Sequence, residues 1–199
     1  DRMKAVADAV KALAAPATVD FSEVVYESET FPNSFKSNAN LAGIVFPQNV
    51  TKTSSAAFQK TGMTSVTLLK GISYGSNAFD SCASLVSVTV EEGVTEIGNY
   101  MFQNTKLTSV TLPNSVTKIN GNAFASCTAL TTIDLGTGVV TISDYAFQKC
   151  AELTEITFPD ATETIGQNAF AGCVKLAKVS FGKNMKTINA YSFTGRSYM

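Results

Sequence analysis

Phenylalanine recurs through this chain at a nearly constant spacing, and this repeat constrains the fold more than any other feature of the sequence. Eight of the 13 Phe residues lie 23, 21, 23, 22, 23, 23 and 23 residues apart; they are Phe35, Phe58, Phe79, Phe102, Phe124, Phe147, Phe170 and Phe193. A fixed period of roughly 20 to 50 residues indicates an array of structural repeats. The residue before each Phe is usually Ala or Ser, which favours a ladder of buried rings over an exposed aromatic platform.

Each repeat also carries the apolar pattern L-x-x-V-x-L, as in Leu107-Val110-Leu112. Thr and Ser fill most positions between the apolar residues, and such alternation predicts a short strand. A second pattern, V-x-x-I (Val116 to Ile119, for example), predicts an extended segment that returns along the other side. The A-F-x-x-C segment predicts a helical turn that directs its Phe into the core. One short strand cannot bury its face alone, so the copies are expected to stack in parallel.

These patterns together predict an α/β repeat solenoid of about seven turns of 21–23 residues, with a parallel β-sheet that lines one face. Residues 1–34 are expected to form a capping helix and a degenerate first turn, and residues 35–199 the solenoid. Met3, Val6, Val10 and Leu13 have helical spacing, and Pro16 is expected to stop the helix. Val19 and Phe21 occupy the strand positions of the degenerate turn. Met199 falls where another strand would begin, so we expect the natural chain to continue or to end in a tail.

The composition excludes several classes of function. Lys plus Arg number 15 and Asp plus Glu 16, so a net charge of −1 gives no electrostatic footprint for nucleic acid. The chain has no His, which rules out Ser-His-Asp and Cys-His catalysis and His-containing metal sites within it. We therefore expect no enzyme, no cofactor and no metal. No apolar run is long enough to span a membrane. Residues 1–15 do not form a signal peptide, so the signal of an exported protein is expected to have been removed.

The four cysteines share one slot of the repeat. Each lies three residues after a ladder Phe, at Cys82, Cys127, Cys150 and Cys173. An even number of Cys in an exported protein suggests disulfides. Equivalent side chains in stacked turns point in parallel, however, which suits a packed column of buried thiols better than a bridge. Zinc is disfavoured because four ligands in a line cannot form a tetrahedron.

The whole repeat, L-x-x-V-x-L-P-x-x-V-x-x-I-(G/N/S)-x-x-A-F-x-x-C, resembles the BspA-like leucine-rich repeats of bacterial surface and secreted proteins. The stretch from Leu107 to Cys127, LTSVTLPNSVTKINGNAFASC, is close to that consensus, and the resemblance covers about residues 35–199. The Cys slot lacks Cys after four of the ladder Phe residues: Phe35, Phe58, Phe102 and Phe193. The resemblance implies a leucine-rich-repeat arc, secreted or at the cell surface, that serves adhesion or recognition without enzymatic activity or a cofactor.

The exposed strand positions are the candidate binding residues. They are Ser87, Thr89, Ser109, Thr111, Thr132, Asp134, Glu155, Thr157, Lys178 and Ser180. Charge appears on this face only toward the C-terminal end, so ligand contacts are expected to centre there. The alternative interpretation is that Thr simply suits an exposed strand.

The sequence therefore predicts a non-catalytic cell-surface or secreted module that binds a protein or glycan, such as host extracellular matrix, through its concave strand face. The alternative is a structural spacer that holds another domain away from the surface. Self-association of solenoids edge to edge is a further expectation. No nucleic-acid partner is expected.

Overall fold

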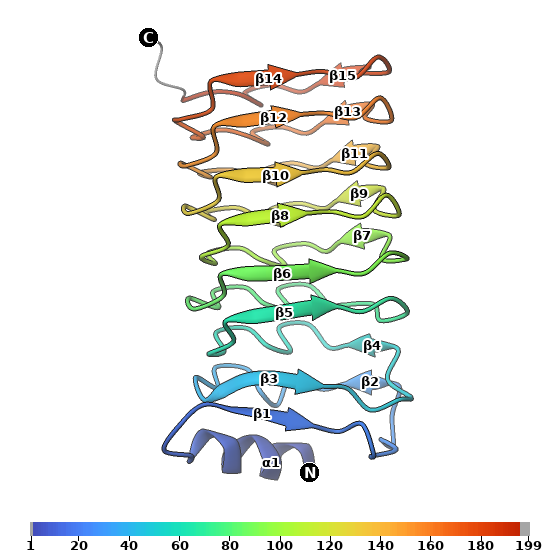
Figure 1. The fold of residues 1–199 in the computed structure, drawn as a ribbon, viewed down its shortest axis with the longest axis vertical. Helices are drawn as coiled ribbons and strands as arrows, with labels where there is room; N and C mark the ends of the chain where they lie inside the picture. Colours follow the sequence, from blue (N-terminus) through green and yellow to red (C-terminus); the bar gives the residue numbers. More distant parts are fainter. Residues whose placement is uncertain (1, 196–199) are drawn as a thin grey trace.

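Each repeat forms one flattened coil, and the coils stack along a single axis (Figure 1). The structure is a computed structural model that describes residues 2–195. Long strands run across the front of every coil in one direction, and short strands run behind them in the opposite direction (Figure 1). The predicted parallel solenoid with an N-terminal helix is confirmed. The expectation based on Met199 lies outside the described residues.

The front strands form the surface that the sequence predicted to be concave, which we call the strand face. They are β1 (Ala17–Asp20), β3 (Leu41–Val45), β5 (Ser65–Leu68), β6 (Ser87–Val90), β8 (Ser109–Thr111), β10 (Thr132–Asp134), β12 (Glu155–Thr157) and β14 (Lys178–Ser180). They are hydrogen-bonded as four parallel pairs, β1–β3, β5–β6, β8–β10 and β12–β14, rather than as one continuous ladder. The strand face is therefore interrupted at regular intervals, a feature that the repeat pattern does not encode.

The V-x-x-I segments form the back of the solenoid, as predicted. The short strands are β2 (Thr30–Phe31), β4 (Lys52–Thr53), β7 (Glu96–Ile97), β9 (Lys118–Ile119), β11 (Thr141–Ile142), β13 (Thr164–Ile165) and β15 (Thr187–Ile188). The last five pair in parallel as one sheet, and β2 pairs with β4. The hydrogen-bonded pairing of strands is thus more continuous on the back than on the front.

The ladder Phe rings lie in the core, as predicted. From Phe58 to Phe193 each ring stacks on the next, with centroids 5.0–5.7 Å apart and interplanar angles of 6–18°. Phe193, in the last coil, is only partly buried. Near the N-terminal end Phe31 stacks on both Phe35 and Phe58, which adds a ring that the spacing did not predict.

The predicted helical turn around each ladder Phe is wrong. In the coil of Phe124, the flanking residues Asn122 and Ser126 are left-handed, with φ of 57° and 59°. The backbone N–H groups of Asn122, Phe124 and Ser126 donate to carbonyls of the next coil over 3.1, 2.8 and 2.7 Å. A helix would direct these N–H groups back into its own turn. Bonding between coils therefore selects this alternating conformation, which we call the Phe turn.

Helix α1 (Arg2–Lys11) covers the first coil (Figure 1). It buries Met3, Ala7 and Val10, and it is shorter than the predicted helix. Leu13 lies beyond its end and is exposed, contrary to its predicted place on the apolar face. The Asn40 side-chain amide donates to the Lys11 and Leu13 carbonyls at 3.0 and 2.9 Å. These bonds satisfy carbonyl groups at the helix C-terminus, which explains where α1 stops.

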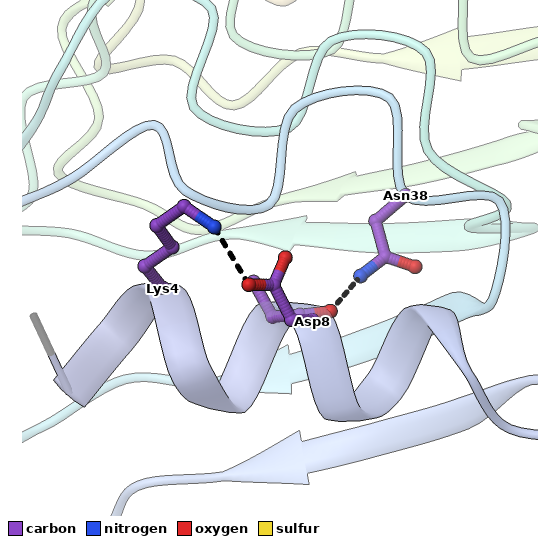
Figure 2. A network of polar contacts seen from close by, with 4 residues as sticks. Lys4, Asp8 and Asn38 are labelled. Carbon is purple, nitrogen blue, oxygen red and sulfur yellow. Dashed lines mark hydrogen bonds and ion pairs between the residues drawn. The ribbon is translucent and has the colours of Figure 1, made fainter.

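A second amide fixes α1 from the side (Figure 2). Asn38 is buried in the slot that holds Cys in later coils, and its Nδ2 donates to the Ala7 carbonyl at 2.9 Å. Its Oδ1 accepts from the Asn40 backbone N–H at 3.2 Å. On the exposed side of α1, Lys4 pairs with Asp8 at 2.7 Å. The repeat position that holds a Cys thiol in later coils therefore holds the Asn38 amide in the coil that contacts α1.

The four cysteines are free and buried in the structure, in the predicted column. Each Sγ donates to the carbonyl of the ladder Phe in the preceding coil, over 3.1–3.2 Å. Thr61 and Thr105 occupy the same slot and bond to the Phe carbonyl of their own coil at 2.9 and 2.8 Å. The slot therefore selects a small side chain that can donate a hydrogen bond.

Candidate functional site

The ten predicted binding residues lie on the strand face in two aligned columns. In the first column Ser65 pairs with Ser87, Ser109 with Thr132 and Glu155 with Lys178; in the second Thr67 pairs with Thr89, Thr111 with Asp134 and Thr157 with Ser180. Nine of the ten predicted residues are exposed and Ser180 is half-buried. The predicted register therefore holds within each of these three pairs of strands.

The residue between the two column positions of each strand explains why the residues of the columns face outward. Val110, Ile133 and Ile156 lie between exposed neighbours and are buried in the core. Successive side chains of a strand point to opposite faces, so burying these three fixes the residues on either side at the surface. The strand face is therefore a consequence of the same apolar positions that build the core.

A hollow of about 270 Å³ lies where β10 and β12 are not paired. Its lining includes four predicted residues, Thr132, Asp134, Glu155 and Thr157. Both carboxylates already have partners: Asp134 Oδ1 accepts from the Gly136 N–H at 2.9 Å, and Glu155 pairs with Lys178 at 3.1 Å. This C-terminal hollow therefore presents two carboxylates and two hydroxyls on a shared floor.

A second hollow, of about 490 Å³, lies between β3 and β5, which are also unpaired. Its lining includes Ser87 and Thr89, which the sequence predicted, and Thr18 and Gly43, which it did not. No charged residue lines it. A Cβ at Gly43 would come within 2.9 Å of Thr18 Oγ1, so β1 and β3 approach closely here. Glycine in a column of serines was the one sequence signal for this N-terminal hollow.

The remaining predicted residues surround the two hollows. Ser109 and Thr111, in β8, lie between them, and Lys178 and Ser180, in β14, pair with Glu155 and Thr157 of the C-terminal hollow. Among residues 2–195, no group of three or more His, Cys, Asp or Glu side chains is placed to hold a metal ion. No helix in this part of the chain is long and apolar enough to cross a membrane.

Stacked parallel coils, a Phe ladder and an exposed strand face together define a leucine-rich repeat solenoid. The BspA-type leucine-rich repeat region matches residues 18–74 and 72–199, in six copies, and the chain belongs to that family. The match begins at residue 18, within the segment that the sequence resemblance did not cover. Repeat proteins of this family are generally non-catalytic. No curated protein is similar enough to count as a relative.

Solved structures of bacterial leucine-rich repeat proteins are similar to this chain. A leucine-rich repeat protein from Eubacterium ventriosum is 25% identical over 73% of this chain and 43% of its own, with a TM-score of 0.63. A leucine-rich cell surface protein from Faecalibacterium prausnitzii is 22% identical over 85% and 65%, with a TM-score of 0.47. The pneumococcal vaccine antigen PcpA is 20% identical over 78% and 51%, with a TM-score of 0.48. The chain thus spans less than two thirds of the length of each.

Proposed function

We propose that this chain is a non-catalytic binding module, secreted or held at the bacterial cell surface, that recognises a protein or glycan through the strand face. The observation that carries the proposal is the pair of aligned columns of mostly exposed side chains, largely Ser and Thr, that run from β5 to β14. A Ser or Thr hydroxyl both donates and accepts a hydrogen bond, so the columns can match many polar groups of a ligand.

Rigidity of the backbone supports this role. In β8, β10 and β12 the exposed side chains flank a buried residue, Val110, Ile133 or Ile156, so they are held in position before a ligand arrives. Small side chains also lose little rotamer freedom on binding. The two hollows give an otherwise flat surface places for a protruding side chain or sugar ring.

The two hollows differ in charge, so they suit different chemical groups of a ligand. The N-terminal hollow is uncharged, whereas the C-terminal hollow contains Asp134 and Glu155. We expect contacts that set the orientation of a ligand to centre on the C-terminal hollow, because the charged residues of β3 to β14 on this face lie in it or beside it, whereas Asp20 in β1 carries a charge at the N-terminal end. With a near-neutral surface, ligand affinity is expected to depend weakly on salt.

The test is a binding screen of the isolated chain against extracellular-matrix proteins, mucins and glycans. Two paired variants divide the strand face: Glu155→Ala with Lys178→Ala, and Ser87→Ala with Ser109→Ala. Lys52→Ala, an exposed change in the back strand β4, is the control. We expect the charged pair to weaken binding at least tenfold and the control to leave it unchanged.

Three results would contradict the proposal in different ways. Loss of binding in the serine pair alone would move the centre to the N-terminal half. Loss of binding in the Lys52 control alone would place the site on another face. No binding to any member of the screen would favour the spacer role, in which the repeats only hold another domain away from the surface.

A further inference from the structure

Asn and Tyr alternate strictly in one column of the Phe turns. The residue two positions before the ladder Phe is Asn77, Tyr100, Asn122, Tyr145, Asn168 and Tyr191 in six successive coils. All six are left-handed, with φ of 61°, 55°, 57°, 60°, 54° and 59°. This Tyr–Asn column lies in the turns that follow the back strands, away from the strand face.

Backbone geometry alone does not explain the tyrosines. The Phe turn imposes a left-handed residue at this position in each coil from Phe58 to Phe193, where Ala56 precedes the six, and Asn tolerates that conformation far better than a bulky residue does. Asn fills the position in alternate coils, so the repeat has an unstrained solution available. A residue kept in an unfavourable conformation indicates that its side chain has a use.

Packing and hydrogen bonding do not account for the tyrosines either. Tyr100 and Tyr191 are 38% and 65% exposed, and Tyr145 is half-buried. Within residues 2–195 the hydroxyls of Tyr100 and Tyr145 and the side-chain amides of Asn122 and Asn168 make no hydrogen bond. The column therefore offers partly exposed rings, and between them the side-chain amides of Asn122 and Asn168 are free to bond.

The backbone keeps the column straight. Tyr100 N–H donates to the Gly121 carbonyl at 3.0 Å, and Tyr145 N–H donates to the Gln167 carbonyl at 2.9 Å, so each member bonds to the residue beside its neighbour. Tyrosines therefore recur every second coil, roughly 10 Å apart at the spacing of neighbouring strands. That distance is comparable with the length of a disaccharide unit in an extended polysaccharide.

A shallow groove of about 510 Å³ runs beside the column. Its lining includes Asn99, Gly121 and Asp144, each of which directly precedes a member of the column. The charged residues in its lining are Lys118 and Asp144, one of each sign, so the groove carries no net charge. Its other polar lining is amide, hydroxyl and backbone, which suits a neutral, hydroxyl-rich ligand.

We propose that the Tyr–Asn column and its groove bind a neutral, extended, β-linked polysaccharide. Each tyrosine ring stacks on the apolar face of one sugar, and the amides between them bond to hydroxyls of the next. A periodic site fits a periodic polymer, whereas most protein surfaces have no repeat to match it. Nucleic acid would require a basic track along the column.

The experiment is calorimetric titration of the whole chain with cellohexaose and chitohexaose, and with maltohexaose as a sugar that does not extend. We expect binding of an extended hexasaccharide and at least tenfold weaker binding in the double variant Tyr100→Asn with Tyr145→Asn. Because Asn relieves the left-handed conformation, the unfolding temperature of this variant should not fall. Tyr100→Phe with Tyr145→Phe keeps both rings and should retain most of the affinity.

The strand-face pair Ser87→Ala with Ser109→Ala should leave hexasaccharide affinity unchanged, which separates this site from the proposed function. The inference is overturned if neither extended hexasaccharide binds at millimolar concentration, or if the Tyr-to-Asn variant binds equally well. A fall in unfolding temperature without loss of binding would make the tyrosines packing residues. Loss of a protein ligand in that variant, with no sugar bound, would make the column a protein contact.

Discussion

At the residue scale, Phe147 is held on both sides by equivalent rings. Its centroid lies 5.2 Å from that of Phe124 and 5.0 Å from that of Phe170, and all three are fully buried. Phe147→Ala should lower the free energy of unfolding by about 3–5 kcal/mol, because the cavity has rigid walls on two sides. Chemical denaturation measures the loss. A change below about 1 kcal/mol would contradict the central place of the ladder in the core.

Hydrogen exchange should show that this loss spreads to the two neighbouring coils, since each coil is stabilised mainly by the coils next to it. Phe181→Ala is the matched control within the same array, because Phe181 lies in the last coil and is half exposed. Its cost should be clearly smaller. An equal cost for both would mean that stacking between coils contributes little.

The thiol column predicts a pH dependence of stability. Burial raises the pKa of Cys127 from an ordinary value of 9.0 to about 11, and it also raises the pKa values of Cys82 and Cys150. The unfolded chain therefore ionises first. The stability contribution is intact below pH 9 and is lost as pH rises from there through the folded pKa values.

Denaturation between pH 7 and 11 checks this sign, and Cys127→Thr is the matched variant because Thr occupies the same slot in two other coils. The variant should lose less stability over that range. Thiol titration should find almost no reactive Cys in the folded chain and four after denaturation without reductant. Fewer than four would reveal a disulfide, and stability that rises above pH 9 would contradict the buried column.

At the element scale, the middle of α1 is held by one buried side-chain amide, that of Asn38. Asn38→Ala removes the bond to the Ala7 carbonyl and leaves that carbonyl without this donor. We expect a loss of about 1–3 kcal/mol, the cost of an unsatisfied buried group. Lys4→Ala removes only an exposed ion pair and should cost less than about 1 kcal/mol. Equal effects would mean that Asn38 does not hold the helix.

Features fixed by the residue pattern within a single coil could be predicted from the sequence. Features fixed by backbone hydrogen bonds between coils could not. Repeat equivalence placed Ser109 opposite Thr132 and Glu155 opposite Lys178, because apolar alternation fixes which side faces out. The Phe turn was predicted as a helix because nothing local shows that its N–H groups donate to the next coil. The N-terminal hollow was missed because it arises where β3 and β5 fail to pair, and Gly43 in a column of serines does not by itself indicate that failure.

At the scale of the whole molecule, the two ends of the solenoid differ. Helix α1 covers the first coil, whereas β14 and β15 have no partner on their outer sides within residues 2–195 (Figure 1). Phe181 is 49% exposed in the last coil, although Phe158, its equivalent one coil earlier, is only 2% exposed. Apolar surface and strand edges therefore meet at one end, as they do at sites of strand pairing between chains.

The C-terminal end of the solenoid also carries a regular set of ion pairs. Four acidic residues of one coil pair with four lysines of the last coil, each 23 residues further on, at 2.7–3.1 Å: Glu152–Lys175, Glu155–Lys178, Asp160–Lys183 and Glu163–Lys186. The lysines form the outermost ring of charge. Because α1 covers the other end, edge-to-edge association of this chain would bring two such ends together around a two-fold axis.

We therefore expect this chain of 199 residues to form a weak dimer at high concentration, and to do so more readily as salt screens the two lysine rings from each other. Sedimentation velocity over a range of concentrations, at low and high salt, measures the association. Phe181→Asp should abolish it, while Val25→Asp, at an exposed apolar residue near the opposite end, should leave it unchanged. Sedimentation as a monomer at every concentration, or a dimer that weakens as salt is added, would show that the last coil does not pair in this way.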